Sequence, residues 1–179
     1  MFLDNSLVFS SYTTPVAVTT TANSSVIDLT GAGAGNAPAM SGGVGYPIGL
    51  DIGAGDGCAM PSVNIVVGTT FTAGGSATLQ ISLQAAPAVS STNNAAGTYT
   101  TLLSTDLIPV ADLVAGTVIN LPIPPILSAE AEALPRFYRL VYTVATGPMT
   151  AGTLSAGILL SQPNIAEIGL YPRNFSSKP

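Results

Sequence analysis

The side chains that most often carry enzyme chemistry are scarce in this chain of 179 residues. It has no histidine, which removes Ser-His-Asp, Cys-His and histidine–metal arrangements together. Its single cysteine, Cys58, cannot form an intrachain disulfide. Glu130 and Glu132 could form a carboxylate pair for acid–base work, but side chains at i and i+2 of a short helix do not face each other. Their position in the first turn of a short helix, where negative side chains stabilise the helix, is the better explanation.

Two glycine-rich stretches, GAGAGN and DIGAGDG, invite comparison with phosphate-binding loops. Neither has the spacing of a dinucleotide or P-loop motif, and no helix pattern follows to present its N-terminus to a phosphate. Asp51 and Asp56 in the second stretch are two carboxylates where calcium needs six to eight oxygens, so a turn is the preferred interpretation. We expect no catalytic, cofactor-binding or metal-ligating residues, and we expect that the protein is not an enzyme.

Two of the four cationic residues, Arg136 and Arg139, lie within one predicted strand, RFYRLVYTVA. Residues three apart in a strand point to opposite faces, so the two arginines do not form one patch. Arg136, next to Pro135, is expected to reach solvent. Arg139 lies between Phe137 and Val141 on the other face. Two interpretations of it stay open: an ion pair with an acid on a neighbouring strand, or an interface anchor among apolar residues.

Composition restricts the classes of partner. Charged residues are 7% of the chain, against about 25% in an average soluble protein, and the net charge is −5. Binding to a nucleic-acid backbone needs clusters of Lys and Arg, and the sequence has only four such residues and no basic cluster. No apolar run is long enough for a membrane helix, and the start, MFLDNSLVFSS, lacks a basic secretory region. We expect a soluble, unexported protein whose neutral surface lies largely against other subunits; a small neutral globule is the alternative.

The elements that must position these residues are strands. Apolar and polar residues alternate with period two, and turn residues separate the runs, which is typical of an all-β sandwich or barrel. Side chains 138, 140, 142 and 144 of the arginine-bearing strand are expected in the core. PVADLVAG and SAEAEALP could each form a turn or two of helix. Eight segments are strand candidates: TPVAVTTT, SVIDL, SVNIVVGTTF, ATLQISLQ, TYTTLL, GTVINLP, RFYRLVYTVA and GTLSAGILL.

The order of several motifs resembles the capsid cement, or decoration, proteins of tailed bacteriophages. The motifs are TANSSVIDLTG, DIGAGDG before a strand, ATLQISLQ, TLLSTDLIPVADLVAGTVINLPIP, and the arginine-bearing strand followed by a TGPMTAG hairpin. The start, LDNSLVFS, is similar to that of the jelly-roll members. The resemblance implies an antiparallel β-sandwich of jelly-roll type. It also implies a homodimer or homotrimer on the outer surface of the virion, made in the host bacterial cytoplasm, which clamps neighbouring major capsid protein subunits.

This resemblance and the strand pattern together suggest three parts of the chain. Residues 1–13 are expected to form an N-terminal arm, 14–162 a jelly-roll domain with a long Gly/Pro-rich loop at 31–61, and 163–179 a C-terminal tail. We expect interface anchors among the apolar and aromatic side chains of both arms, together with one arginine. A carbohydrate-binding β-sandwich of a phage tail or surface adhesin is the alternative function, although the chain has no Trp to serve as a sugar platform. The predicted interface residues are Phe2, Leu3, Phe9, Tyr12, Arg139, Tyr171 and Phe175.

Overall fold

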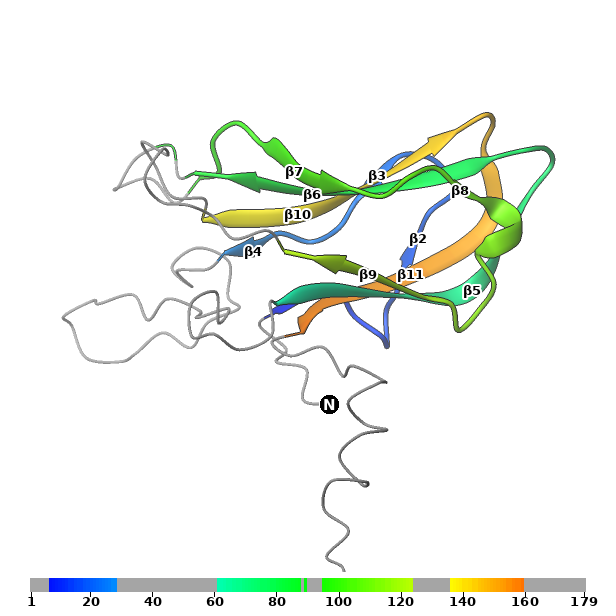
Figure 1. Ribbon diagram of the computed structural model, residues 1–179, viewed down its shortest axis with the longest axis horizontal. Coiled ribbons are helices and arrows are strands. Elements are labelled where there is room, and N and C mark those ends of the chain that lie inside the picture. Colours follow the sequence, from blue (N-terminus) through cyan, green and yellow to red (C-terminus); the bar gives the residue numbers. More distant parts are fainter. Residues whose placement is uncertain (1–6, 29–60, 88, 90–94, 124–135, 160–179) are drawn as a thin grey trace, which may run out of the picture.

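Two antiparallel sheets lie face to face in the protein (Figure 1). The structure is a computed structural model that describes residues 7–28, 61–87, 89, 95–123 and 136–159. The first sheet contains β1 (Val8–Ser10), β2 (Val16–Ala17), β5 (Ser62–Ala73), β9 (Val118–Pro122) and β11 (Met149–Leu159). The second sheet contains β3 (Ala22–Asn23), β4 (Ile27–Asp28), β6 (Thr78–Ala86), β7 (Thr100–Ser104), β8 (Ile108–Pro109) and β10 (Phe137–Ala145). A 3-10 turn, η2 (Val110–Asp112), follows β8.

The strand order identifies the sandwich as a jelly roll. The first sheet runs β1-β11-β5-β9 and the second β3-β10-β6-β7. The short strands β2, β4 and β8 pair with β11, β10 and β6, beside β1, β3 and β7 respectively, so each sheet has four strand positions. Along the chain, each strand position is followed by a position in the opposite sheet, except that β6 and β7 are consecutive and lie in the same sheet. Eight positions wound in this order make the double Greek key of a jelly roll, and each of the eight predicted segments overlaps a strand.

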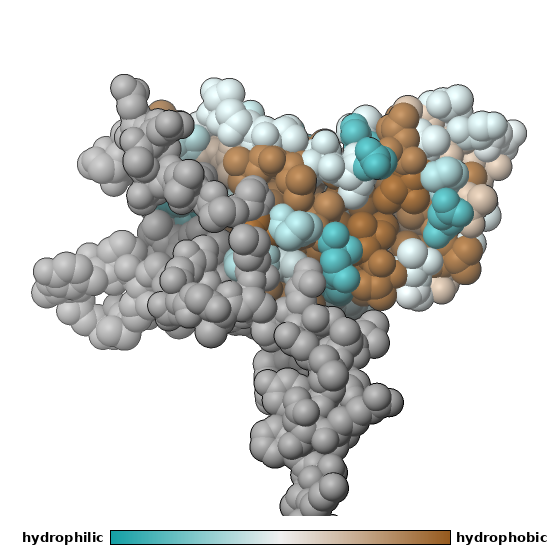
Figure 2. All heavy atoms as spheres, in the orientation of Figure 1, coloured by the Kyte–Doolittle hydropathy of each residue, from teal (hydrophilic) through white to brown (hydrophobic). Residues whose placement is uncertain are grey.

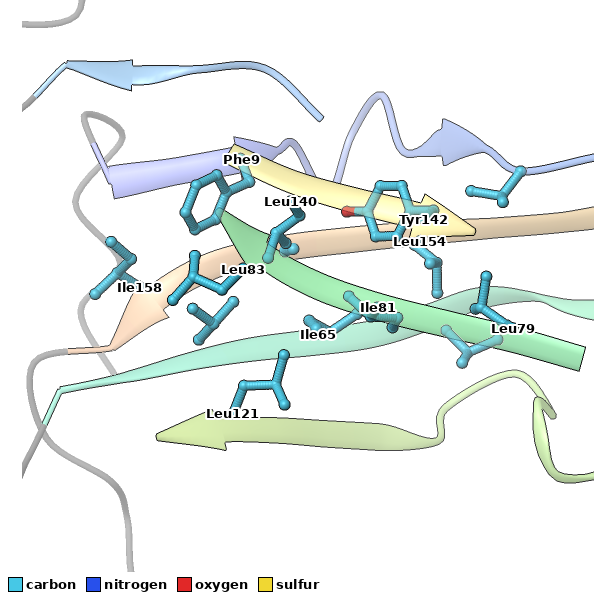
Figure 3. Close-up of a cluster of buried hydrophobic side chains, with 14 of the residues drawn as sticks. Phe9, Ile65, Leu79, Ile81, Leu83, Leu121, Leu140, Tyr142, Leu154 and Ile158 are labelled. Atoms are coloured by element: carbon cyan, nitrogen blue, oxygen red, sulfur yellow. The ribbon is translucent and has the colours of Figure 1, made fainter. Parts of the chain in front are cut away.

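Alternating side chains build one core between the sheets. In β6 the odd-numbered residues from Leu79 to Leu83 are fully buried while the even-numbered residues are only partly covered. In the register of β6 and β10, Leu83 lies opposite Leu140 and Ile81 opposite Tyr142, so apolar pairs stack towards the first sheet (Figure 3). Burying each such side chain contributes about 1.5 to 3 kcal/mol. The buried side chains at 138, 140 and 142 confirm the predicted inward face of β10, and Val144 is partly buried against the same cluster.

The expected N-terminal arm is wrong in part, because its second half belongs to the sandwich. β1 pairs with β11, with Val8 opposite Gly157 and Ser10 opposite Ala156. Between them Phe9 points inward and is 0% exposed, in the same buried cluster as Leu7 (Figure 3). A side chain without exposed surface cannot touch a partner, so Phe9 is a core residue and not an interface anchor.

The stretch after β10 is also not a hairpin. β10 lies in the second sheet and β11 in the first, and they do not pair with each other. The connecting residues Thr146 and Gly147 both have positive φ, 64° and 112°, which turns the chain sharply across the end of the sandwich (Figure 1). A crossing between sheets follows from the jelly-roll order, in which β11 must reach the position between β1 and β5.

Several expectations concern residues outside the described ranges. They are the loop at 31–61 with Asp51, Asp56 and Cys58 (apart from its last residue, Pro61, which is described), the short helix predicted near Glu130 and Glu132, and the tail at 163–179. Apart from the correction at β1, the division of the chain into an arm, a domain and a tail stays a prediction. Among the described residues, no helix has the length and apolar character needed to cross a membrane.

Candidate interaction surfaces

Arg136 and Asp28 form a partly buried ion pair just before β10. Arg136 Nε donates to Asp28 Oδ1 at 2.7 Å, and Nη2 donates to Oδ2 at 2.8 Å. The side chains are 13% and 3% exposed. The hydrogen bonds that Arg136 donates to Asp28 hold the pKa of Arg136 above its usual value. Arg136 was expected to reach solvent, and it does so only in part, because β4 runs beside β10 and brings Asp28, opposite Phe137, within reach. The pair fastens β4 to β10.

Arg139 lies on the outer face of the second sheet, because its neighbour Leu140 points into the core. Its partner on the adjacent strand is a neutral amide: Nε and Nη2 both donate to Gln84 Oε1, at 3.0 and 2.8 Å. The guanidinium carbon also lies 3.8 Å from the centre of the Tyr99 ring. Among the described residues no carboxylate pairs with Arg139, and Asp28 pairs with Arg136. Most of the acids of the chain lie outside the described residues, so the ion-pair interpretation of Arg139 stays a prediction there.

Four residues from neighbouring segments make up the group that we call the Arg139 cluster: Arg139, Gln84, Tyr99 and Thr101. Gln84 lies directly opposite both Arg139 on β10 and Thr101 on β7. Its Nε2 donates to Thr101 Oγ1 at 3.2 Å, which leaves its carbonyl oxygen for the arginine. Burial raises the pKa of the Tyr99 hydroxyl, and the positive charge of Arg139 offsets part of that rise. The cluster is a fixed positive charge on a neutral face.

A second surface runs along the side of the sandwich where β7 and β9 end the two sheets. Leu107, Val114 and Val118 are exposed there, at 57%, 51% and 52%. Figure 2 shows hydrophobic surface across this side, where β7, β8 and β9 face the viewer in Figure 1. Partly buried apolar residues continue it inward to the core. We call this surface the apolar edge; its partly buried members are Leu102, Leu103, Ile108, Val110 and Ile119.

The local chain explains why the apolar edge is exposed. In β9, Ile119 and Leu121 point towards the core, so Val118 must point outward from the first sheet. After η2, Leu113 is fully buried and its successor Val114 therefore faces solvent. β7 and β9 are the last strands of their sheets in the described part of the chain. Unpaired sheet edges with apolar side chains are typical of protein contact sites.

Tyr12 lies on neither surface. Its side chain is 43% exposed and its hydroxyl donates weakly to Asn64 Oδ1, at 3.5 Å, on the outer face of the first sheet. Asn64 in turn donates to Asn120 at 2.8 Å. Burial by these neighbours raises the pKa of Tyr12. Tyr12 and Arg139 therefore lie on opposite faces of the sandwich, and the structure does not bring them together.

Four of the predicted interface residues, Phe2, Leu3, Tyr171 and Phe175, lie outside the described residues. The sequence analysis missed the apolar edge. Its signal was present as Leu107, Val114 and Val118 in a stretch punctuated by Asp and Gly, but a short, irregular run does not show which apolar residues face out. No group of three potential metal ligands gathers in the ranges that the structure describes.

Comparison with known proteins adds one finding. A family model described as Bbp16, for a family of bacteriophage origin, matches residues 12–158. The match spans the strands from β2 to β10 and nearly all of β11, and it therefore includes both surfaces. No curated protein matches the chain.

Proposed function

The chain belongs to the Bbp16 family of bacteriophage proteins, and we propose that it is a capsid cement protein, which binds the outer surface of the phage head and clamps adjacent major capsid protein subunits. On this proposal it acts by adhesion, without catalysis and without a cofactor. The virion is its final location. The motif resemblance that suggested a cement protein agrees in origin with the family, because both are bacteriophage proteins.

The observation that carries the proposal is the apolar edge. A soluble monomer exposes few large apolar side chains, and three of them on and between the strands that end the two sheets favour a permanent protein contact. Leu107, Val114 and Val118 are each more than half exposed, and the described charges near them are two aspartates, Asp106 and Asp112. A typical contact buries roughly 800 Å² per partner, at about 25 cal/mol for each Å² of apolar area before the costs of association.

Multivalency would turn such a modest contact into a clamp. A homodimer or homotrimer places two or three apolar edges on one particle, and after the first contact the others form within the same complex. Linked contacts of this kind strengthen binding by about 10² to 10⁴. If the spacing of capsid subunits matches only in the mature shell, binding favours that shell, because a ligand stabilises the state that it binds better.

The proposal is tested by adding the purified protein to phage shells that lack it and measuring how much binds. The double variant Val114→Thr/Val118→Thr keeps the side-chain shape but places two hydroxyls in the contact, and each unpaired buried hydroxyl costs about 1 to 3 kcal/mol. We expect at least tenfold weaker binding in a sedimentation assay. The matched control is Val89→Thr, because Val89 is 60% exposed but follows β6, away from the apolar edge.

Two results would contradict the proposal. Equal binding by the double variant and by Val89→Thr would remove the apolar edge from the contact. Cryo-electron microscopy of particles made with this protein should show it on the outer shell; its absence from that surface would exclude the cement function itself.

A further inference from the structure

The Arg139 cluster has hydrogen-bonding capacity that the described part of the chain does not use. A guanidinium group has five N–H donors in a planar fork. Two of them, on Nε and Nη2, go to the single acceptor Gln84 Oε1. The side chain is partly exposed on the sheet surface. The three other N–H groups find no acceptor among the described residues and can donate to a partner.

The charge of Arg139 is not neutralised by a carboxylate in the described part of the chain, whereas that of Arg136 is. Of the strands in this sheet, β3, β6, β7, β8 and β10 contain no Asp or Glu, and the one acid, Asp28 on β4, is paired with Arg136. Stacking on Tyr99 and bonding to a neutral amide stabilise the guanidinium but leave its full charge. A positive fork on a neutral face is complementary to a carboxylate, which accepts two parallel hydrogen bonds from arginine.

The arginine is also held in place before any partner arrives. Tyr99 covers one side of the guanidinium, and Gln84 is fixed in turn by its bond to Thr101. A free arginine side chain loses rotational freedom when it binds, and a contact made by an ordered one avoids most of that cost. Ordered arginines of this kind are frequent binding hot spots.

We propose that the Arg139 cluster is a second contact site, which receives an Asp or Glu carboxylate of the phage shell subunit. This inference rests on the proposed function and adds a charge-specific contact to the apolar edge. Gln84 acts in it as a positioning residue, whose carbonyl orients the guanidinium fork.

A second copy of this chain is a poorer occupant. In a two-fold symmetric contact through this face, both copies would bring Arg139 to the same interface. The one acid on the surrounding strands, Asp28 on β4, already pairs with Arg136 and does not offset two Arg139 charges. A contact that is not two-fold symmetric tends to propagate into rings or filaments instead of closing. A different protein, with its own carboxylate, avoids both problems.

Binding to shells that lack this protein tests the inference. Removing one partner of a hydrogen-bonded charge pair that becomes buried weakens binding by roughly 30-fold or more. We expect this loss of binding for Arg139→Gln. We expect a smaller loss for Gln84→Ala, which keeps the charge of Arg139 but removes the carbonyl that orients its guanidinium group. Thr143→Ala, on the same face of β10, is the matched control and should bind as the wild type does. An unchanged thermal unfolding midpoint in each variant separates binding from folding.

Chemical coupling identifies the partner group. The chain has one lysine, Lys178, so Arg139→Lys adds a single new side-chain amine. Shells decorated with this variant are treated with a carbodiimide, which activates carboxylates. The carboxylate that faces position 139 should then form an amide with the new amine, and the carbodiimide takes up the water and becomes a urea. Mass spectrometry should locate the amide on an Asp or Glu of the shell subunit, with no counterpart in the wild type.

The outcomes separate this inference from the proposed function. If wild-type protein does not bind shells, both are overturned. If wild-type protein binds and Arg139→Gln binds equally well, the cement function stands and the Arg139 contact is overturned. Coupling of position 139 to a second copy of this chain, or to no carboxylate of the shell subunit, would likewise overturn it.

Discussion

Gly152 in β11 is a position where both backbone and space exclude a side chain. Its φ is 141°, a conformation that residues with a Cβ rarely adopt. A Cβ built there would overlap the ring of Phe71, which is buried on the neighbouring strand β5. We therefore expect Gly152→Ala to lower the free energy of unfolding by about 3 kcal/mol or more, as measured by urea denaturation.

Two other glycines provide controls for this prediction. Gly116 has φ of 90° but open space around it, so Gly116→Ala should cost only the backbone strain, about 1 to 2 kcal/mol. Gly75 has neither constraint, and Gly75→Ala should change stability by less than about 0.5 kcal/mol. If Gly152→Ala unfolds no more easily than Gly116→Ala, the overlap with Phe71 has no energetic effect.

For single residues, the sequence predicts faces well and partners poorly. The period of two correctly assigns Tyr138, Leu140 and Tyr142 to the core, with Val144 partly buried against it. Burial raises the pKa of Tyr142 to about 12, as its place in the core requires. The partners of the arginines depend on which strands are neighbours. Asp28 is more than a hundred residues from Arg136 in sequence, and no local pattern joins them.

Among the secondary-structure elements, the ion pair of Arg136 predicts how β4 is held. Arg136→Met leaves the Asp28 carboxylate buried without its cation, which typically costs about 3 to 5 kcal/mol. We expect that loss in urea denaturation, together with faster hydrogen exchange in β4. Arg139→Met is the matched control: Arg139 lies on the sheet surface beside a neutral amide, so its loss should cost no more than about 1 kcal/mol.

A similar loss of stability in the two arginine variants would contradict the different roles assigned to them. A small loss for Arg136→Met alone would mean that the other contacts of β4 hold it to β10 without the ion pair.

The long strands were predictable because each repeats its apolar period several times. β5, β6, β10 and β11 all lie within segments predicted as strands or extend slightly beyond them. β1 was not predicted. Its three residues, VFS, show too little alternation to distinguish a strand from an irregular arm. Its place is fixed by tertiary structure: β11 needs a neighbour on one side, and Phe9 fills the core there.

At the scale of the whole molecule, the contact surfaces are harder to predict than the fold. The fold follows from strand order, and the motif resemblance correctly implied the jelly roll. The apolar edge combines residues from β7, β8, η2 and β9, and it becomes visible only when the two sheets end on the same side. Its members look like ordinary core residues in the sequence. What marks them is exposure, a property of the assembled sandwich.

The scarcity of charge in the molecule predicts how its attachment responds to salt. Charged residues are 7% of the chain, and the proposed contact combines an apolar edge with one charge pair that docking buries. Salt screens exposed charges but affects apolar contacts and buried pairs much less. We therefore expect the dissociation constant for shells to change by less than about tenfold between low salt and about 1 M NaCl. Sedimentation of decorated shells across a salt series measures this, and the Val114→Thr/Val118→Thr variant should bind more weakly at every concentration. Release of the wild-type protein by moderate salt would mean that exposed charges, and not the apolar edge, hold it to the shell.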